Sequence, residues 1–206
     1  KGDCKADAGG SGSVNRIAVY CGSSPGADPV YANAARALGA EMAARGIGLV
    51  FGGGRIGLMG VIADAVLEAG GEAIGVIPTA LEEKELAHTG CSELHVVSTM
   101  HERKSLMADF AKGFIAMPGG FGTLDEIFEM LTWGQLGYHT RPCGFLNISG
   151  YYDSLFTFLD HCVEARFVTH VHRKMIITET DPAALLDSMQ TFAAPDQAKW
   201  LDRFDL

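Results

Sequence analysis

The stretch that decides the fold is Pro118-Gly119-Gly120-Phe121-Gly122-Thr123-Leu124-Asp125-Glu126. It follows an apolar run over 114–117 and leads into apolar residues at helical spacing over 124–131. A buried strand is therefore predicted to run through a glycine-rich turn into a helix. Glycines let the backbone approach a ligand closely, and the free N–H groups at a helix start attract an anion, most often a phosphate. We predict a phosphate-binding turn over residues 119–123.

The same segment has a second interpretation. Thr123 and Glu126 have the spacing of a capping box, and carboxylates at Asp125 and Glu126 would favour the positive end of the helix dipole. A cap, however, does not require a proline and three glycines before it. If a phosphate does bind here, the two carboxylates must be balanced by a cation, for which Arg103 and Lys104 are candidates.

Composition limits the classes of protein that the chain can belong to. At 206 residues, 48% of them hydrophobic, the chain is long enough for one domain with a substantial core. The formal net charge of −9 argues against a nucleic-acid partner, and no apolar run approaches the roughly 20 residues of a membrane helix. Residues 1–13 are Gly- and Ser-rich and lack the apolar core of a signal peptide. We predict a disordered tail over 1–13 and a single nucleotide-binding domain over 14–206.

Cysteine and histidine usage gives no indication of a metal site. The five cysteines are widely spread and form no C-x-x-C pair, so free thiols in a reducing cytoplasm are the simplest interpretation. Of the seven histidines, His170 and His172 stand beside Arg173 in what we predict to be a solvated turn. We therefore predict a cytoplasmic protein with no metal ion and no cofactor.

Short apolar runs alternate with longer segments of helical periodicity. Strands are predicted over 17–21, 47–51, 73–77, 94–97, 114–117, 143–147 and 175–178. Helices are predicted over 29–45 and 58–69, from 100, from 124, and over 155–165 and 183–192. Continuous apolar strands separated by helices indicate a parallel sheet covered on both faces. The predicted fold class is therefore α/β, a single doubly wound, Rossmann-like domain with helices on both faces.

Three glycine turns are expected to meet at one edge of this sheet. In doubly wound sheets, ligands bind beyond the carboxyl ends of the strands, where the strand order reverses. The turns after the first, second and fifth strands should gather there. Gly22 and Ser23 in the first turn, and Gly53 and Gly54 in the second, are therefore secondary candidates for ligand contact.

Residues 52–57 match the motif G-x-G-x-x-G between a strand and a helix. In dinucleotide-binding domains the motif follows the first strand, and an acid at the end of the next strand binds the ribose. Here it follows the second strand, and Pro78 and Thr79 stand where the acid would be. We interpret this loop as a close backbone approach to a smaller ligand and not as a dehydrogenase site.

The segment 98–107 places an arginine on the apolar face of a helix. Thr99 and Glu102 form a capping box, which predicts a helix from Met100. Arg103 then falls on the face that carries Met107, and an unpaired buried charge is very costly. Arg103 either makes a structural ion pair, with Glu126 as one candidate, or faces the ligand pocket, with Lys104 about 100° further around the helix. Further along, the cluster Trp133, Leu136 and Tyr138 is either core or a self-complementary dimer face.

Two motifs together resemble one family. Met100-His101-Glu102-Arg103-Lys104, followed by the glycine-rich stretch 118–126, is similar to the Lonely Guy (LOG) family of cytokinin riboside 5′-monophosphate phosphoribohydrolases, some of which carry an older lysine decarboxylase label. The resemblance runs from about residue 16 to 192 and implies a homodimer. By position it implies Arg103 and Glu126 as the catalytic pair. It implies nucleotide contacts at Glu85, Lys104, residues 119–125 and Thr132, with Asp125 standing where a glutamate is common.

The predicted function is cleavage of the N-glycosidic bond of an adenosine 5′-monophosphate with an N6 substituent, giving free base and ribose 5-phosphate. The small-molecule nucleotide is then the partner, and no cofactor is needed. Two other classes stay open. One is a nucleotide or cofactor carrier of the same fold without chemistry. The other is a pyridoxal-phosphate decarboxylase, for which Lys104 is the lysine nearest a plausible site.

Overall fold

Seven strands form one parallel sheet in the computed structural model, which describes residues 16–82, 84 and 86–195. The strands are β1 (Arg16–Tyr20), β2 (Gly48–Phe51), β3 (Ala73–Pro78), β4 (Glu93–Val97), β5 (Phe114–Ala116), β6 (Cys143–Leu146) and β7 (Ile176–Glu179). Their order in the sheet is β4-β3-β2-β1-β5-β6-β7, and every neighbouring pair is parallel. The predicted fold class is confirmed.

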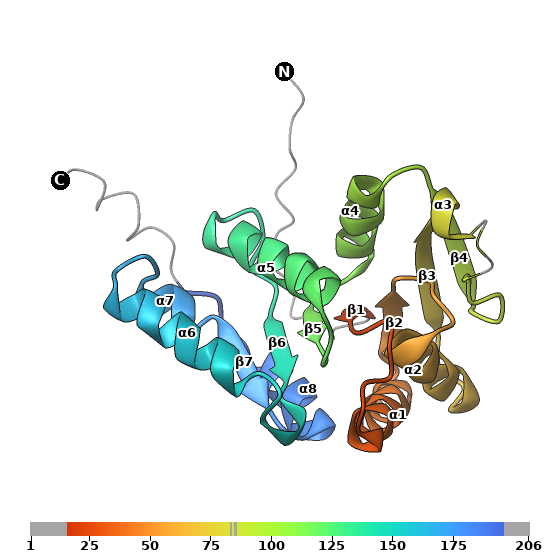
Figure 1. Cartoon of the computed structure of the whole chain (residues 1–206), viewed down its shortest axis with the longest axis horizontal. Coiled ribbons are helices and arrows are strands. Elements are labelled where there is room, and N and C mark those ends of the chain that lie inside the picture. The colour runs from red at the N-terminus through yellow and green to blue at the C-terminus, as the bar shows by residue number, and fades with distance from the viewer. Residues whose placement is uncertain (1–15, 83, 85, 196–206) are drawn as a thin grey trace.

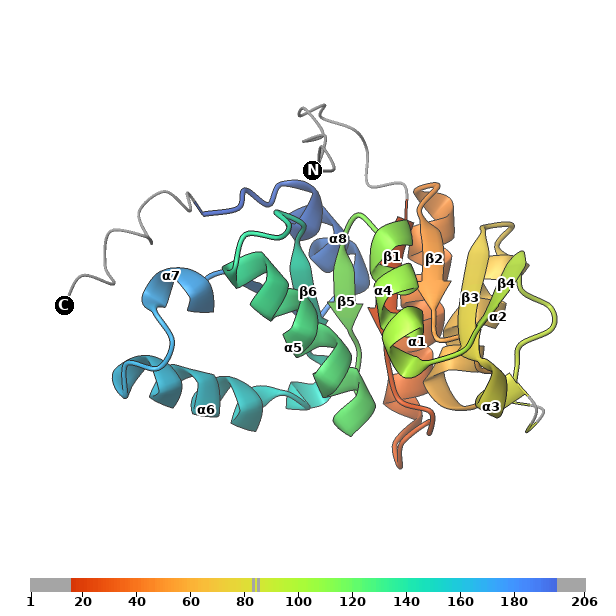
Figure 2. The same ribbon diagram turned by 90° about the horizontal axis from the view of Figure 1, so that it is seen from above.

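Helices cover both faces of the sheet (Figures 1 and 2). One face carries α1 (Pro29–Ala44), α2 (Gly57–Glu68) and α8 (Pro182–Gln190), and the other carries α4 (Met100–Phe110) and α5 (Phe121–Gln135). The long helix α6 (Asp153–Glu164) has a single buried residue, Leu159. The short helices α3 (Thr79–Glu82) and α7 (His170–Arg173) and the 3₁₀ turn at Ile148–Gly150 complete the described elements.

Strand alternation divides the core into two layers. Ile17 and Val19 point from β1 into the layer under α1, α2 and α8, whereas Ala18 and Tyr20 point into the layer under α4 and α5. Successive side chains of a strand face opposite sides, so a strand buried on both faces reads as a continuous apolar run. This is why the apolar runs alone predicted the strands.

Local signals account for the helix ends. Asp28 and Asp181 cap α1 and α8 by accepting hydrogen bonds from Val30 N–H and Ala184 N–H, both at 2.9 Å, and a proline follows each cap. The predicted strands and helices are all present with ends within two residues, except at α5. The predicted turn at His170 is a short helix, because Thr169 caps it and Arg173 is held by Asp160 at 2.7 Å.

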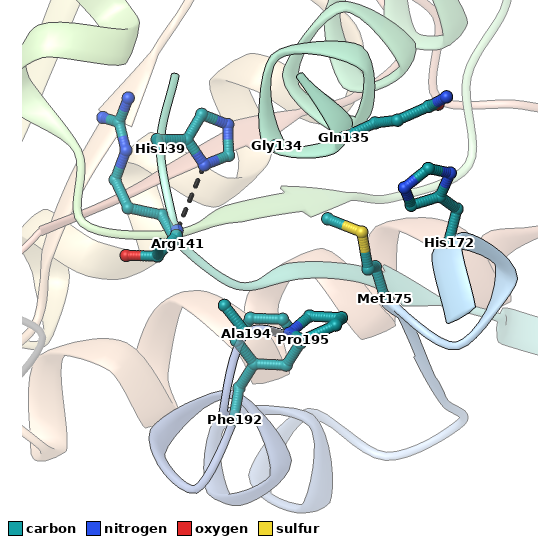
Figure 3. Close-up of a pocket in the computed structure, with 10 residues that line it drawn as sticks. Gly134, Gln135, His139, Arg141, His172, Met175, Phe192, Ala194 and Pro195 are labelled. Carbon is teal, nitrogen blue, oxygen red and sulfur yellow. Dashed lines mark hydrogen bonds between the residues drawn. The ribbon is translucent and has the colours of Figure 1, made fainter. Parts of the chain in front are cut away.

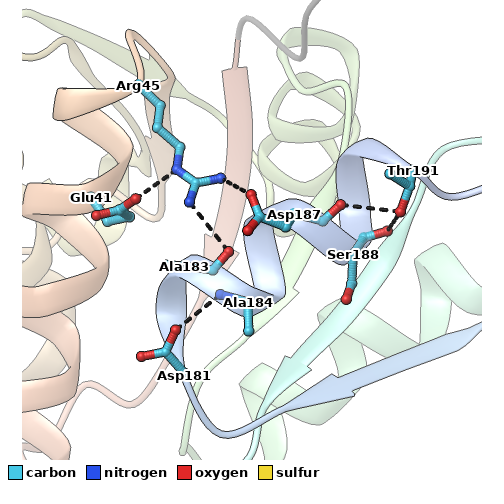
Figure 4. A network of polar contacts seen from close by, with 8 residues as sticks. All are labelled: Glu41, Arg45, Asp181, Ala183, Ala184, Asp187, Ser188 and Thr191. Atoms are coloured by element: carbon cyan, nitrogen blue, oxygen red, sulfur yellow. Dashed lines mark hydrogen bonds and ion pairs between the residues drawn. The ribbon is translucent and has the colours of Figure 1, made fainter.

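A network of charged residues joins the first helix, α1, to the last, α8 (Figure 4). Arg45, just beyond α1, donates to Glu41 at 2.7 Å and to both Asp187 and the carbonyl of Ala183 in α8. The network joins segments more than 130 residues apart at the face opposite α4 and α5. It lies outside the cavity described below, so we assign it to stability alone.

The described residues contain no metal-binding group and no helix long and apolar enough to cross a membrane. Four of the five cysteines lie in this part of the chain, and all four are free. The tail predicted over 1–13 lies outside the described residues, and the domain predicted over 14–206 extends past them at both ends.

Candidate active site

The turns after β1, β2 and β5 interlock at the point where the strand order reverses. Gly22 N–H donates to the carbonyl of Pro118 at 3.0 Å, and Leu58 N–H at the start of α2 donates to the carbonyl of Gly22 at 3.0 Å. A Cβ on Gly119 would lie 2.1 Å from the hydroxyl oxygen of Thr123 and 2.8 Å from the backbone nitrogen of Gly22. The close approach therefore requires glycine, and the predicted meeting of the three turns is confirmed.

A cavity of about 510 Å³ opens beside these turns. Its polar part comes from the turns and from two charged side chains, and the rest of its lining, called the apolar wall below, is apolar. The polar and backbone lining is Gly22, Ser23, Gly52, Gly54, Gly120, Phe121, Gly122, Thr123, Arg103 and Glu126. The rest is Val19, Tyr20, Cys21, Ile56, Met59, Ile77, Leu81 and Leu86. A volume of this size is typical of small-molecule sites.

The start of α5 corrects one prediction. The helix begins at Phe121 with Gly120 as its N-cap, and no side chain caps it. Thr123 therefore lies inside the first turn, and Asp125 and Glu126 lie in the second, so neither the capping box nor the dipole explanation holds. The first N–H groups of a helix have no partner within it. At α5 those residues, 121–123, line the cavity.

Arg103 lines the cavity, and two backbone carbonyls and one carboxylate hold its guanidinium. Its helix starts where predicted, with Glu102 N–H donating to Thr99 at 3.1 Å. The guanidinium donates from Nε to the carbonyl of Val76 at 3.1 Å and from Nη2 to the carbonyl of Gly52 at 3.2 Å. Nη1 lies 3.4 Å from Oε1 of Glu126. The side chain thus both makes the predicted ion pair and lines the pocket, so the two interpretations hold together.

Glu126 is a buried carboxyl with a perturbed pKa. The residue is only 8% exposed. Burial raises the pKa of Glu126 to about 7, against the lowering effect of the Arg103 charge; Asp125 and Glu129 raise it further and Lys104 lowers it. A carboxyl that titrates near neutrality inside a cavity is typical of catalytic acids and bases.

Lys104 and Asp125 neutralise each other beside the cavity and are not among its lining residues. The Lys104 ammonium lies 3.0 Å from Asp125 and 3.1 Å from Glu129. Burial lowers the pKa of Lys104, but the hydrogen bonds and charges of these two carboxylates outweigh it, so the pKa is raised. Of the two expected counter-charges, Arg103 pairs directly with Glu126, whereas Lys104 pairs with Asp125 and Glu129.

Of the remaining predicted residues, only some line the cavity. Gly53 takes a left-handed φ of +70° and is not a lining residue, although Gly52 and Gly54 on either side are. Thr132 is exposed further along α5, where its hydroxyl donates to the carbonyl of Phe128 at 2.7 Å. Leu124 packs against the core, and Glu85 lies outside the described residues.

The apolar wall was missed by the sequence analysis. Ile56, Met59, Ile77, Leu81 and Leu86 come from four separate segments, and each reads in sequence as an ordinary core residue. Gly52 was seen only as part of a motif. No local pattern identifies these residues, because they meet only after β2 and β3 pair.

A second, much smaller cavity lies near the amino end of β6 (Figure 3). Its volume of about 10 Å³ is room for a single water. Burial, together with the charge of Arg141, lowers the pKa of His139 to about 4. The imidazole bonds the carbonyl of Met130 at 2.9 Å and accepts from the N–H of Arg141 at 3.1 Å, so it is a neutral structural group.

Fold and cavity together define a doubly wound α/β protein with a cavity of small-molecule size at the switch point and a buried carboxyl–guanidinium pair in it. The sequence profile of the family described as "Possible lysine decarboxylase" matches residues 59–189. The cytokinin riboside 5′-monophosphate phosphoribohydrolase LOG of Oryza sativa subsp. japonica is 46% identical over 177 residues, which cover 86% of this chain and 73% of that protein. LOG2 of Arabidopsis thaliana has the same description and is 44% identical over 177 residues, which cover 86% of this chain and 83% of that protein. The chain belongs to the LOG family.

Solved structures extend the likeness in fold. The molybdenum cofactor binding protein of Rippkaea orientalis aligns with a TM-score of 0.67 at 20% identity, over 86% of this chain and 96% of that one. The molybdenum cofactor carrier protein of Chlamydomonas reinhardtii aligns with a TM-score of 0.63 at 21% identity, over 85% of this chain and 95% of that one. At these identities the likeness concerns the fold alone.

Proposed function

We propose that this protein hydrolyses the N-glycosidic bond of adenosine 5′-monophosphates that carry an N6 substituent, releasing the free base and ribose 5-phosphate. The observation that carries the proposal is the Arg103–Glu126 pair, buried in a cavity that the first residues of α5 also line. The names of the LOG relatives support the substrate class. Relatives of 44% and 46% identity over most of the chain make the same activity the simplest assignment.

Each part of the cavity has a role in this reaction. The N–H groups of residues 121–123, at the start of α5, hold the 5′-phosphate, with Gly119 and Gly120 allowing the close approach. The apolar wall around Met59 and Leu86 accommodates the base and its substituent. Asp125, Lys104 and Thr132 support the α5 segment from outside the cavity; their proposed ligand contacts, like that of Glu85, rest on the resemblance.

The chemical step needs a negative charge beside the sugar. The bond between C1′ and the base nitrogen breaks, its electron pair leaves with the base, and the sugar gains oxocarbenium character. The Glu126 carboxylate stabilises that charge and orients and deprotonates the water whose oxygen bonds to C1′. Arg103 stabilises the ionised carboxylate and assists the departing base. The proton that Glu126 takes from the water balances the one that the base gains, so the net reaction adds one water across the bond.

The pKa of Glu126 predicts the pH dependence of activity. The ionised carboxylate is the active form, and its pKa in the free enzyme is about 7. We expect kcat/KM for AMP to rise with pH through an apparent pKa of about 7, well above that of an ordinary glutamate. Initial rates between pH 5 and pH 9, roughly two units on either side of that value, measure it.

A charge variant checks that this titration belongs to Glu126. Asp125→Asn removes a charge that raises the pKa of Glu126 and leaves Lys104, whose charge lowers it, with Glu129 as its one remaining partner among the ion pairs described above. The acid limb of the profile should therefore move to lower pH. A limb near pH 4.5, or one that does not respond to Asp125→Asn, would assign the titration to another group.

Product analysis tests the proposal directly. Purified protein is incubated with AMP and with an N6-prenylated AMP, and free base and ribose 5-phosphate are measured. Release of both products in equal amounts is expected. Binding of nucleotide without release of base would favour the carrier function, which the fold of the molybdenum cofactor proteins also permits.

The decarboxylase alternative conflicts with the state of its lysine. An internal aldimine forms from a neutral amine, and the Lys104 ammonium is held by two carboxylates that keep its pKa raised. An absorption band of an aldimine in the protein mixed with pyridoxal phosphate would reverse this conclusion.

We also propose a cytoplasmic homodimer. The free cysteines support the compartment. At the end of α5, Leu136 is 63% exposed and Tyr138 is 75% exposed, whereas Trp133 packs partly into the core. Exposed apolar residues of this size mark interaction sites, and a self-complementary face gives a two-fold dimer. Light scattering should give twice the chain mass, and Leu136→Glu with Tyr138→Arg should give the monomer mass; an unchanged mass would place the interface elsewhere.

A further inference from the structure

The position of the Arg103 guanidinium depends on a residue in the turn after β2. Nη2 donates to the carbonyl of Gly52, and the same residue has no side chain on the side where the guanidinium lies. We propose that Gly52 is a positioning residue of the active site: its missing side chain leaves the space for the Arg103 guanidinium, and its carbonyl holds that group against Glu126. Only the predicted effect on kcat rests on the proposed function; the predicted effect on stability does not.

Contact with Arg103, and not the backbone conformation, excludes a side chain at position 52. A Cβ built on Gly52 would lie 1.8 Å from Nη2 and 2.9 Å from Cζ of Arg103. Gly52 is not among the glycines with a left-handed φ, so the backbone itself would accept alanine. Occupation of the space by the guanidinium is therefore what excludes a side chain.

Two contacts restrain how the Arg103 side chain can move. Nε is tied to the carbonyl of Val76 at 3.1 Å, on the neighbouring strand. The helix that carries Arg103 is anchored by its cap at Thr99. The sulfur of Met59 lies 3.1 Å from the same Cβ position, but it belongs to the flexible end of its side chain and can yield. The 1.8 Å contact with Nη2 is the severe one, so its relief must come from displacement of the guanidinium.

Displacement would separate Arg103 from Glu126. Nη1 and Oε1 are already 3.4 Å apart, so a shift of about an ångström breaks the pair. Misplacement of a catalytic group by about 1 Å costs on the order of a hundredfold in rate. The phosphate-binding start of α5 does not involve Gly52, so Gly52→Ala should lower kcat about a hundredfold while KM for AMP stays close to that of the wild type.

A double-mutant cycle tests the coupling. Gly52→Ala is made in the wild type and in Arg103→Ala, where the new methyl group meets only the flexible end of Met59. The melting temperature should fall on Gly52→Ala in the wild type and stay nearly unchanged in the Arg103→Ala background. Likewise, kcat should fall on Gly52→Ala in the wild type and stay nearly unchanged in the Arg103→Ala background. If Gly52→Ala alone fails to fold, the double variant should fold, because the clash is gone.

Two further measurements separate positioning from a general structural role. Loss of the guanidinium from Glu126 removes an effect that lowers its pKa, so the acid limb of kcat/KM in Gly52→Ala should move to higher pH. Gly90→Ala is the matched control, an exposed glycine outside the cavity whose Cβ would approach only His88, at 3.3 Å. It should leave kcat and the pH profile as in the wild type.

The opposing results are equally distinct. An equal loss of melting temperature and kcat in both backgrounds, or failure of the double variant to fold, would show that Gly52 does not act through Arg103. Wild-type kcat and stability in Gly52→Ala would show that the guanidinium does not need the space. If the wild type releases no base from any nucleotide, the proposed function fails, while the cycle in melting temperature still tests the Gly52–Arg103 coupling.

Discussion

Glu126→Gln should lower the turnover of AMP at least a hundredfold while the protein stays folded. Glutamine fills the same volume, and its amide oxygen can take the place of the carboxylate oxygen that lies 3.4 Å from Nη1 of Arg103. It cannot carry negative charge toward an oxocarbenium-like sugar or take a proton from water. General-base and electrostatic contributions of this kind amount to about 10²–10⁴-fold. The measurement is kcat for release of adenine, together with the dissociation constant of AMP.

Binding should separate from turnover in this variant. The phosphate loses a repulsive charge, so AMP binds as well as before or more tightly. Glu129→Gln is the matched control, because Glu129 lies on the same helix but does not line the cavity. It should keep most of the turnover. Near-normal release of adenine by Glu126→Gln would move the chemistry to another residue and leave Glu126 as the structural partner of Arg103.

Adenosine should be a far poorer substrate than AMP. If the N–H groups at the start of α5 hold the 5′-phosphate, removal of the phosphate loses several charge-assisted hydrogen bonds of about 1.5–3 kcal/mol each. Two of them already correspond to about a hundredfold or more in kcat/KM. The same reasoning predicts that ribose 5-phosphate inhibits competitively and that ribose does not. Both comparisons are initial-rate measurements on the wild-type protein.

Equal rates on the two substrates would contradict the phosphate assignment specifically. The Arg103–Glu126 pair could then still act on a nucleoside, so the reaction class would survive and the role of residues 119–123 would not. Inhibition by ribose as strong as that by ribose 5-phosphate would lead to the same conclusion by an independent route.

Much of the fold could be predicted because its signals are local. A strand buried on both faces is a short apolar run, and a helix start is a capping residue or a proline. Asp28, Thr99 and Asp181 act as caps through residues two or three positions away, which sequence spacing reveals directly. The alternation of these elements then leaves a doubly wound sheet as the simplest arrangement.

The start of α5 shows where local reasoning failed. Thr123 has the spacing of a cap, but the helix begins at Phe121, after a turn whose Pro118 and Gly119 lie against Gly22 in the turn after β1. Lys104, by contrast, was one of the two cations expected to balance the carboxylates of this segment, and it pairs with Asp125. Its second partner, Glu129, was not expected, because it comes into reach only when α4 and α5 lie side by side on the sheet.

The sequence by itself determined that strands, glycine turns and helices alternate, and that Arg103, a charge on an apolar helix face, must find an anion. These follow from hydrogen bonding and periodicity within a few residues, and from the high cost of an unpaired buried charge. Only the tertiary structure decided that the partner is Glu126, that Gly52 leaves space for the guanidinium, and that apolar residues of separate segments line the same cavity as the start of α5. Those relations depend on which strands pair and how closely helices pack on them, and packing distances are properties of the assembled sheet that no single segment encodes.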